Sequence, residues 1–104
     1  MPTVEITRIH CFRTTSGLGD DDMRLYVGAT EVFDKQMGDD DTTTPNVTET
    51  FTDKVKVSVY ERDEVSQSDL IGSFYATKHE AGDGVLTEVM TGDGSHYDLS
   101  YEVT

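Results

Sequence analysis

Residues 54–60 read KVKVSVY, and polar and apolar side chains alternate through the run. A period of two is typical of a β-strand with one face against a core, so its valines are expected to point inward. Residues 70–78 read LIGSFYATK and are the expected partner strand, with Gly72 where a backbone bends or another element approaches closely. The two runs predict adjacent strands joined by a short acidic loop.

Short runs of the same kind recur along the chain, separated by Gly, Pro and Asp. The further expected strands are residues 4–12, 23–27, 31–33, 47–51, 85–90 and 96–103. In the first of these the alternation shifts between Ile6 and Ile9, which predicts a bulge. In the last, the residues expected to point inward are Tyr97, Leu99, Tyr101 and Val103. No segment shows a helical period, and eight short strands predict one all-β domain over residues 1–104, an antiparallel β-sandwich with a barrel as the lesser alternative.

The loop between the two quoted runs carries three carboxylates, Glu61, Asp63 and Asp69. Glu61 and Asp63 share one face of an extended chain, and a return of the chain would bring Asp69 beside them. Like charges this close repel unless a cation lies between them, and hard oxygen ligands on a flexible loop suit calcium better than a transition metal. The sequence therefore predicts a calcium site here, and an acidic turn that is only solvated is the alternative.

Acidic residues outnumber basic residues by 21 to 8, which gives a formal charge of -13. This charge argues against nucleic acid and against bare anionic membrane as direct partners, but it allows a partner that is bridged by a cation. A surface rich in Asp and Thr and poor in Lys is also typical of proteins that stay soluble in high salt. The rival hypothesis is therefore a metal-free acidic structural or interaction module adapted to high salt.

The sequence shows no catalytic motif, and the chain is predicted not to be an enzyme. Its histidines lack the spacing of a zinc site, and Gly17-Leu18-Gly19 lacks the rest of a phosphate-binding pattern. Cys11 has apolar neighbours and is expected to be a buried thiol. No apolar run approaches the roughly 20 residues that cross a bilayer, and no signal peptide is evident. No transmembrane segment is expected, and the default location is cytoplasmic, with signal-less export or peripheral membrane association left open.

Three segments together match the motifs of a known family. Residues 57–63, VSVYERD, followed by residues 68–72, SDLIG, place acidic side chains before an apolar pair and a glycine. Residues 45–51, PNVTETF, are similar to an Asn-Pro-Val-x-x-Glu-x-Phe segment with its first two residues exchanged, and residues 22–27, DMRLYV, are similar to an Asp-Pro-Tyr-Val-x-Val strand. With these segments the chain resembles a C2 domain, the calcium-dependent phospholipid-binding sandwich of protein kinase C, synaptotagmin and phospholipase C.

The resemblance implies that the acidic segments meet on loops at one end of the sandwich. Together with the loop described above, it implies the calcium ligands Asp20, Asp21, Asp22, Asp40, Glu61, Asp63 and Asp69. The partners that it implies are calcium ions, and through them phospholipid headgroups or a protein. Residues 96–103 resemble a strand that comes first in some C2 domains and last in others. Its place at the end of this sequence implies an eight-stranded sandwich with the phospholipase C-type strand order.

The chain departs from the family pattern at three points. Ser16 falls where an earlier loop aspartate is usual, so Asp20 or Asp21 must substitute for it. Glu61 replaces the usual aspartate with a longer side chain that can still coordinate an ion. The basic cluster that some members use for phosphoinositides is absent, so the resemblance supports calcium binding more than membrane binding.

Overall fold

The computed structural model describes residues 1–16, 19–62 and 68–104. Over these ranges the chain forms nine strands and two 3-10 helices: β1 (Thr3–Arg13), β2 (Asp21–Val27), β3 (Thr30–Met37), β4 (Thr42–Thr43), β5 (Val47–Thr50), β6 (Lys54–Glu61), β7 (Asp69–Thr77), η1 (Lys78–Glu80), β8 (Val85–Met90), η2 (Gly92–Gly94) and β9 (His96–Val103). The predicted number of eight strands is one too few. The additional strand, β4, pairs two threonines with Ile9 and His10 of β1, inside a polar run that has no apolar alternation to reveal it.

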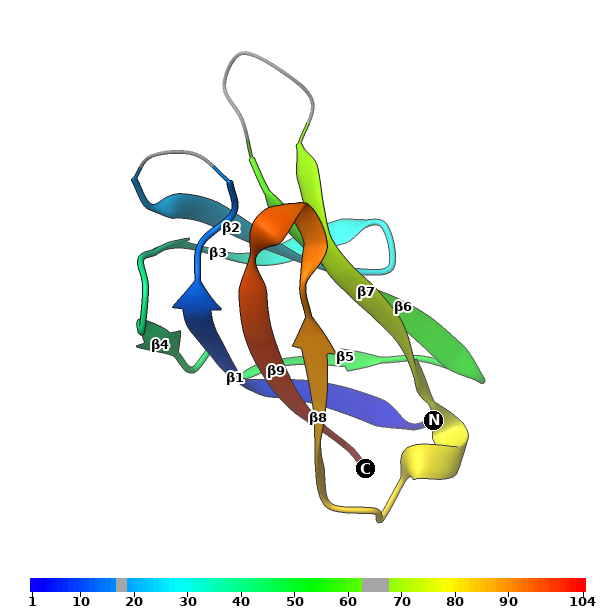
Figure 1. Ribbon diagram of the computed structural model, residues 1–104. Coiled ribbons are helices and arrows are strands. Elements are labelled where there is room, and N and C mark those ends of the chain that lie inside the picture. The colour runs from blue at the N-terminus through cyan, green and yellow to red at the C-terminus, as the bar shows by residue number, and fades with distance from the viewer. Residues whose placement is uncertain (17–18, 63–67) are drawn as a thin grey trace.

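The strands form two antiparallel sheets that pack face to face, which confirms the predicted sandwich (Figure 1). The first sheet has the order β4-β1-β9-β8, and β5 also pairs with β1. The second sheet has the order β3-β2-β6-β7. The last strand, β9, lies between β1 and β8, and this confirms the phospholipase C-type strand order.

The core between the sheets is built from the alternating apolar faces of the strands. In β2 every second residue is buried, and in β9 the residues predicted to point inward are at most 1% exposed: Tyr97, Leu99, Tyr101 and Val103. Val57 and Val59 of β6 are fully buried, and Val55 packs partly buried against the same core. Each such side chain contributes about 1.5–3 kcal/mol to folding by leaving water.

Irregular points in the ladders explain two features of the sequence pattern. The β1–β9 register shifts between Ile6 and Arg8, which is the bulge expected from the broken alternation of the first strand. The β6–β7 register shifts just after Val59, opposite Gly72. A Cβ atom on Gly72 would lie 2.5 Å from Cγ of Met90, so the glycine allows β8 to approach β7 closely.

Strand β3 is longer than residues 31–33, where it was predicted. It continues to Met37 in register with β2, although Asp34, Lys35 and Gln36 are all exposed and show no apolar alternation. Charged residues of this kind on an edge strand discourage pairing with another chain.

No helix in the described part of the chain is long and apolar enough to cross a membrane.

Candidate functional site

Glu61 and Asp69 lie directly opposite each other at the end of the second sheet. The β6–β7 ladder pairs Glu61 with Asp69, and the β2–β6 ladder pairs Glu61 with Met23. Paired residues of neighbouring strands point to the same face, and Met23 is fully buried, so both carboxylates lie on the inner side of the sheet at its end. The return of the chain thus places Asp69 beside Glu61. Asp63 lies outside the described residues, and its position near this pair stays a prediction.

Asp21 is 2% exposed at the start of β2, and protein donors hold its carboxylate. The backbone N–H of Thr15 donates to both oxygens, at 3.2 and 3.0 Å, and the Thr15 hydroxyl donates to Oδ1 at 2.6 Å. The hydroxyl of Tyr97 donates to Oδ2 at 2.6 Å. Hydrogen bonds of this kind stabilise an ionised carboxylate inside a protein. A calcium ion at Asp21 would therefore have to displace some of these donors.

The surroundings of Asp21 keep two neighbouring groups protonated. Burial raises the pKa of Tyr97 far above its usual value, and the hydrogen bond to Asp21 raises it further. Burial also raises the pKa of the Cys11 thiol, although a hydrogen bond with Tyr97 acts in the opposite direction. Cys11 is 0% exposed, which confirms its predicted burial.

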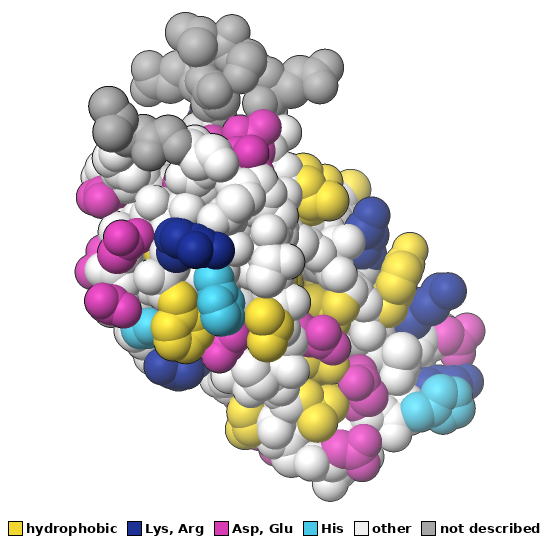
Figure 2. All heavy atoms as spheres, in the orientation of Figure 1, with side chains coloured by type: hydrophobic (Ala, Val, Ile, Leu, Met, Phe, Trp, Pro, Cys, Tyr) yellow, Lys and Arg dark blue, Asp and Glu magenta, His cyan; other side chains and the backbone are white. Residues whose placement is uncertain are grey.

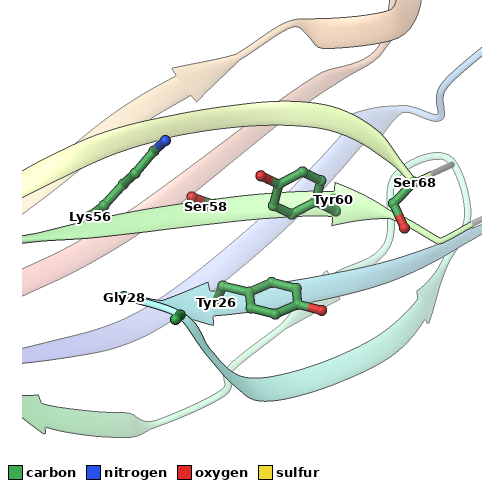
Figure 3. A pocket seen from close by; sticks show the side chains of 7 residues that line it. Tyr26, Gly28, Lys56, Ser58, Tyr60 and Ser68 are labelled. Atoms are coloured by element: carbon green, nitrogen blue, oxygen red, sulfur yellow. The ribbon is translucent and has the colours of Figure 1, made fainter.

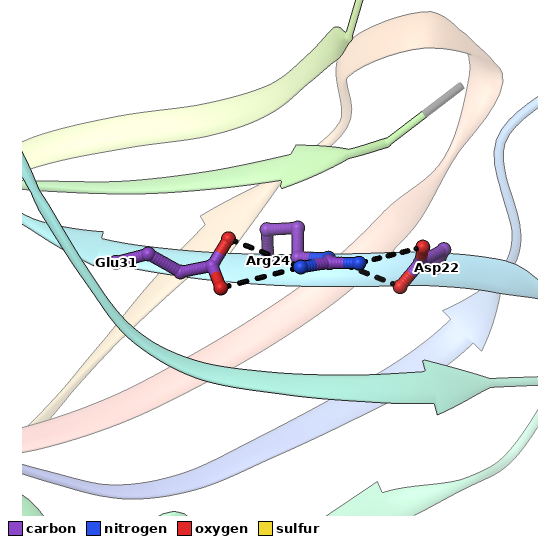
Figure 4. A network of polar contacts seen from close by, with 3 residues as sticks. All are labelled: Asp22, Arg24 and Glu31. Carbon is purple, nitrogen blue, oxygen red and sulfur yellow. Dashed lines mark hydrogen bonds and ion pairs between the residues drawn. The ribbon is translucent and has the colours of Figure 1, made fainter. Parts of the chain in front are cut away.

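Asp22 points to the opposite face of β2 and is held by Arg24 (Figure 4). Its Oδ1 accepts a hydrogen bond from Nε of Arg24 at 3.2 Å, and its Oδ2 accepts one from Nη2 at 3.1 Å. Nη1 of Arg24 donates to both carboxylate oxygens of Glu31, at 3.3 and 3.2 Å. The pKa of Arg24 is raised above its usual value, and the largest cause is its hydrogen bond to Asp22. Arg24 therefore neutralises Asp22 on the outer face of the sheet.

Asp20 and Asp40 lie at the adjoining end of β3. A turn over residues 38–41 is closed by a 3.1 Å hydrogen bond from the N–H of Asp41 to the carbonyl oxygen of Gly38, and the Gly38 N–H donates to Oδ2 of Asp41 at 2.7 Å. Asp20 lies against this turn, because its Oδ1 would be 2.7 Å from a Cβ atom on Gly38. Asp40 is exposed and has a φ of 65°, a conformation that aspartate adopts more readily than most residues. Asp20, Asp40 and Asp41 therefore form an acidic cluster beside the start of β2.

The structure brings the predicted segments to one end of the sandwich. Asp21 pairs with Met37 at the end of β3, and Met23 pairs with Glu61 at the end of β6, so the ends of the three strands are neighbours. Within residues 1–16, 19–62 and 68–104, however, no group of three or more His, Cys, Asp or Glu side chains is placed so that it could hold a metal ion. The described carboxylates alone therefore do not form a complete coordination group.

The 3-10 helix η2 also belongs to this end, and the sequence showed it only as a glycine turn. A Cβ atom on Gly92 would lie 2.2 Å from the carbonyl oxygen of Leu70, so η2 lies directly against β7. It meets the first loop where the N–H of Ser16 donates to the carbonyl oxygen of Asp93 at 2.8 Å. The contact of Asp21 with Tyr97 was also missed, although a tyrosine expected to point inward needs a partner for its hydroxyl.

A shallow groove of about 340 Å³ lies on the outer face of the second sheet (Figure 3). Tyr26 and Tyr60 line it, with their ring centroids 5.6 Å apart, and so does Ser58, which is 4% exposed. Lys56 is the one basic side chain among the described residues that line the groove.

Comparison with known proteins finds similarity in structure. No protein-family model and no curated protein sequence matches the chain. A solved C2 domain is 10% identical over 100% of this chain and 99% of that domain, with a TM-score of 0.63. A C2 domain of plant extended synaptotagmin 1 is 14% identical over 98% of this chain and 90% of that one, with a TM-score of 0.60.

Human GIVD cytosolic phospholipase A2 is 18% identical over 98% of this chain, with a TM-score of 0.59, and this chain spans 15% of that protein. A structure of the same enzyme with methyl gamma-linolenyl fluorophosphonate inhibitor and terbium chloride matches 98% of this chain and 17% of that one, at 17% identity and a TM-score of 0.55. Identities this low establish the fold alone. Together with the strand order described above, the likeness shows that the chain has the fold of a C2 domain.

Proposed function

We propose that this chain is a non-catalytic calcium-binding module in which Glu61, Asp63 and Asp69 hold the ion. The observation that carries the proposal is the direct pairing of Glu61 with Asp69 at one end of a C2 fold. Like charges opposite each other destabilise a sheet, and a divalent cation between them replaces repulsion with attraction. Calcium accepts about six to eight oxygen ligands in flexible geometry, which suits carboxylates from two strand ends and a loop.

The remaining predicted ligands have supporting roles in this proposal. Asp20 and Asp40, beside the turn of residues 38–41, increase the negative potential of this end and provide oxygens for a second ion. Asp21 and Asp22 already have protein donors, so they hold the strand end in place for their neighbours.

Three carboxylates leave coordination positions open for oxygens of a partner. A phosphate of a phospholipid headgroup or a carboxylate of a protein would fill them, and the ion would lower the negative charge of the surface that meets the partner. With a formal charge of -13, the chain repels anionic surfaces in the absence of the ion. The proposed function is therefore calcium-dependent association with a membrane or a protein.

Calorimetric titration of chelator-treated protein with calcium tests the proposal. We expect saturable binding that Asp69→Asn and Asp63→Asn each weaken strongly. Asp83→Asn is the matched control, because Asp83 is exposed in the turn before β8, at the other end of the sandwich. If the wild-type protein shows no binding, the calcium site is refuted and the metal-free acidic module remains.

Terbium luminescence locates the ion by an independent signal. Terbium occupies calcium sites and emits when a nearby tyrosine is excited, and Tyr60 immediately precedes Glu61. We expect Tyr60→Phe to reduce the sensitised emission while the affinity for calcium stays unchanged. Equal emission from wild type and from Asp69→Asn would show that terbium binds elsewhere.

A further inference from the structure

Basic and aromatic side chains are grouped on the outer face of the first sheet, whereas Glu61 and Asp69 belong to the second sheet. The group, called here the β1–β9 stripe, consists of Arg8, His10, Phe12, Arg13 and His96. The β1–β9 ladder pairs Arg13 with His96, and it pairs Arg8 with Ser100 and His10 with Asp98 of β9. On the face shown in Figure 2, dark blue and cyan side chains lie next to yellow ones over these strands.

The aromatic rings of the stripe pack against one another and leave an apolar surface open. The ring centroids of His10 and Phe12 are 4.3 Å apart, and those of Phe12 and His96 are 4.7 Å apart. Phe12 remains 43% exposed, and Val89 of β8 is 60% exposed beside them. Val89 pairs with Asp98, which in turn pairs with His10, so these side chains form one continuous row.

The arginines of the stripe have unused hydrogen-bond donors. The guanidinium of Arg8 makes no hydrogen bond or ion pair with any of the described residues, and Arg8 is exposed. Nε of Arg13 donates to the carbonyl oxygen of Gly94 at 3.0 Å, which orients the guanidinium and leaves its Nη groups without a partner among the described residues. Arg24, by contrast, binds two carboxylates. A free guanidinium presents a planar pair of donors that matches a carboxylate.

The spacing of the stripe selects an extended ligand. Arg8, His10 and Phe12 alternate along one face of β1, so they follow one another at about 7 Å. Side chains on one face of an extended peptide have the same spacing. A peptide that lies along β1 would therefore place carboxylates two residues apart against Arg8 and His10. An apolar side chain two residues further would reach Phe12 and Val89.

Acidic groups on both sides of the stripe favour a narrow ligand. The turn of residues 38–41 is tied to the end of β1, because the N–H of Thr14 donates to Oδ1 of Asp39 at 3.0 Å and the N–H of Cys11 donates to the carbonyl oxygen of Asp41 at 2.8 Å. Asp93 borders the same end of β1 on the side of β9, where its carbonyl oxygen accepts a hydrogen bond from the N–H of Ser16. A flat anionic surface such as a bilayer would meet these carboxylates, whereas a single extended chain would pass between them.

Asp98 is the one carboxylate in the row formed by Val89, Asp98 and His10. Its position limits the electrostatic repulsion between its carboxylate and an acidic ligand. Its Oδ1 is buried and has no hydrogen-bond partner among the described residues, and it lies 3.9 Å from Nε2 of His96. This oxygen faces His96 below the surface that a ligand would contact.

We infer that the β1–β9 stripe binds an extended acidic segment of a partner protein, with two carboxylates two residues apart and an apolar residue two positions further. This surface lies on the sheet opposite the one that carries Glu61 and Asp69, so none of its residues is a proposed calcium ligand. It gives the chain a second, independent contact with a protein.

Fluorescence anisotropy at physiological salt tests the inference. The probe is a fluorescein-labelled peptide of alternating glutamate and serine that ends in phenylalanine, and the reference is an isomer with adjacent glutamates. We expect the alternating peptide to bind more tightly. We expect Arg8→Ala, Arg13→Ala and Phe12→Ser each to weaken its binding about fivefold or more. All three side chains are exposed, so these variants should fold.

Lys35→Ala is the matched control, because it removes an exposed positive charge from β3 of the other sheet. Lys35→Ala and Asp69→Asn should both leave binding unchanged. Equal binding of the two peptide isomers, or unchanged binding by Arg8→Ala and Arg13→Ala, would overturn the inference. So would stripe-dependent binding of anionic vesicles or of a single-stranded oligonucleotide in place of the peptide.

Discussion

The hydroxyl of Tyr97 donates a 2.6 Å hydrogen bond to the carboxylate of Asp21, a residue 76 positions earlier in the chain. Tyr97 belongs to β9 of the first sheet and Asp21 to β2 of the second, so this bond joins the two sheets at the end that carries the acidic loops. Both residues are buried. The bond therefore couples the packing of the core to the position of the first loop.

Tyr97→Phe should lower the free energy of unfolding by about 1.5–3 kcal/mol, because it removes one donor from a buried, charged acceptor. Urea denaturation at neutral pH measures the change. Tyr75→Phe is the control, because Tyr75 is 52% exposed and no hydrogen bond of its hydroxyl is known in the described part of the chain. Equal unfolding midpoints for wild type and Tyr97→Phe would show that the bond contributes nothing to stability.

Stability should fall as the pH rises above about 10, the ordinary pKa of tyrosine. Burial raises the pKa of both Tyr97 and Tyr101 in the folded chain, and hydrogen bonds to Asp21 and Glu80 raise these values further. The unfolded chain then loses protons that the folded chain keeps, so stability decreases by about 1.4 kcal/mol per pH unit for each such tyrosine. Urea midpoints between pH 8 and about 11 measure this, and Tyr97→Phe should give a shallower decline. A flat profile would contradict the raised pKa values.

Calcium should stabilise the fold through the loop that joins β6 and β7. When free calcium is at a hundredfold excess over Kd, the free energy of unfolding rises by about 2.7 kcal/mol, and the melting temperature rises by about 10 °C or more. Asp69→Asn should abolish most of this shift, because it removes a charged oxygen ligand of the proposed site. Asp83→Asn should keep the full shift. The site would be wrong if the wild type melted at the same temperature in calcium and in chelator.

Gly92→Ala should destabilise the fold more than Gly72→Ala. A Cβ atom at position 92 would lie 2.2 Å from the carbonyl oxygen of Leu70, and only movement of η2 or β7 relieves that clash. At position 72 the nearest atoms are Cγ and Cβ of Met90, at 2.5 and 2.6 Å. A change of the methionine rotamer relieves the first contact, and a small shift of β8 relieves the second. We expect Gly72→Ala to lower the free energy of unfolding by about 1–3 kcal/mol and Gly92→Ala to lower it by more, as measured by thermal or urea unfolding. The reverse order would show that η2 is the more adaptable element.

The sequence was sufficient for the fold wherever apolar residues alternate clearly. Residues 85–90 and 96–103 are strands with the bounds that the pattern predicted. The pattern failed for β4 and for the outer part of β3, because polar residues at a sheet edge pair through their backbones and leave no periodic trace in the side chains.

The candidate site was predictable only in part for a related reason. The pairing of Glu61 with Asp69 follows from local spacing across one hairpin, which a sequence displays directly. The roles of Asp21 and Asp22 depend on Tyr97 and Arg24. The alternation of β2 places Asp21 on the inner face, but it does not give the partner that each carboxylate meets. A run of aspartates therefore looks uniform in the sequence, although adjacent members have different partners in the structure.

The position of β9 between β1 and β8 determines when this chain can fold during synthesis. Thr3 and Thr104 exchange two backbone hydrogen bonds of 2.9 Å, so β1 must wait during synthesis until β9 has been made. Until residues 96–103 emerge, β1 and β8 have no central strand to pair with, and apolar faces stay in contact with water. Folding must then close contacts across nearly the whole chain, which places it among slowly folding β-proteins, with times of milliseconds to seconds. A nascent chain of this kind exposes strand edges and apolar faces during elongation, and both favour aggregation until β9 is in place.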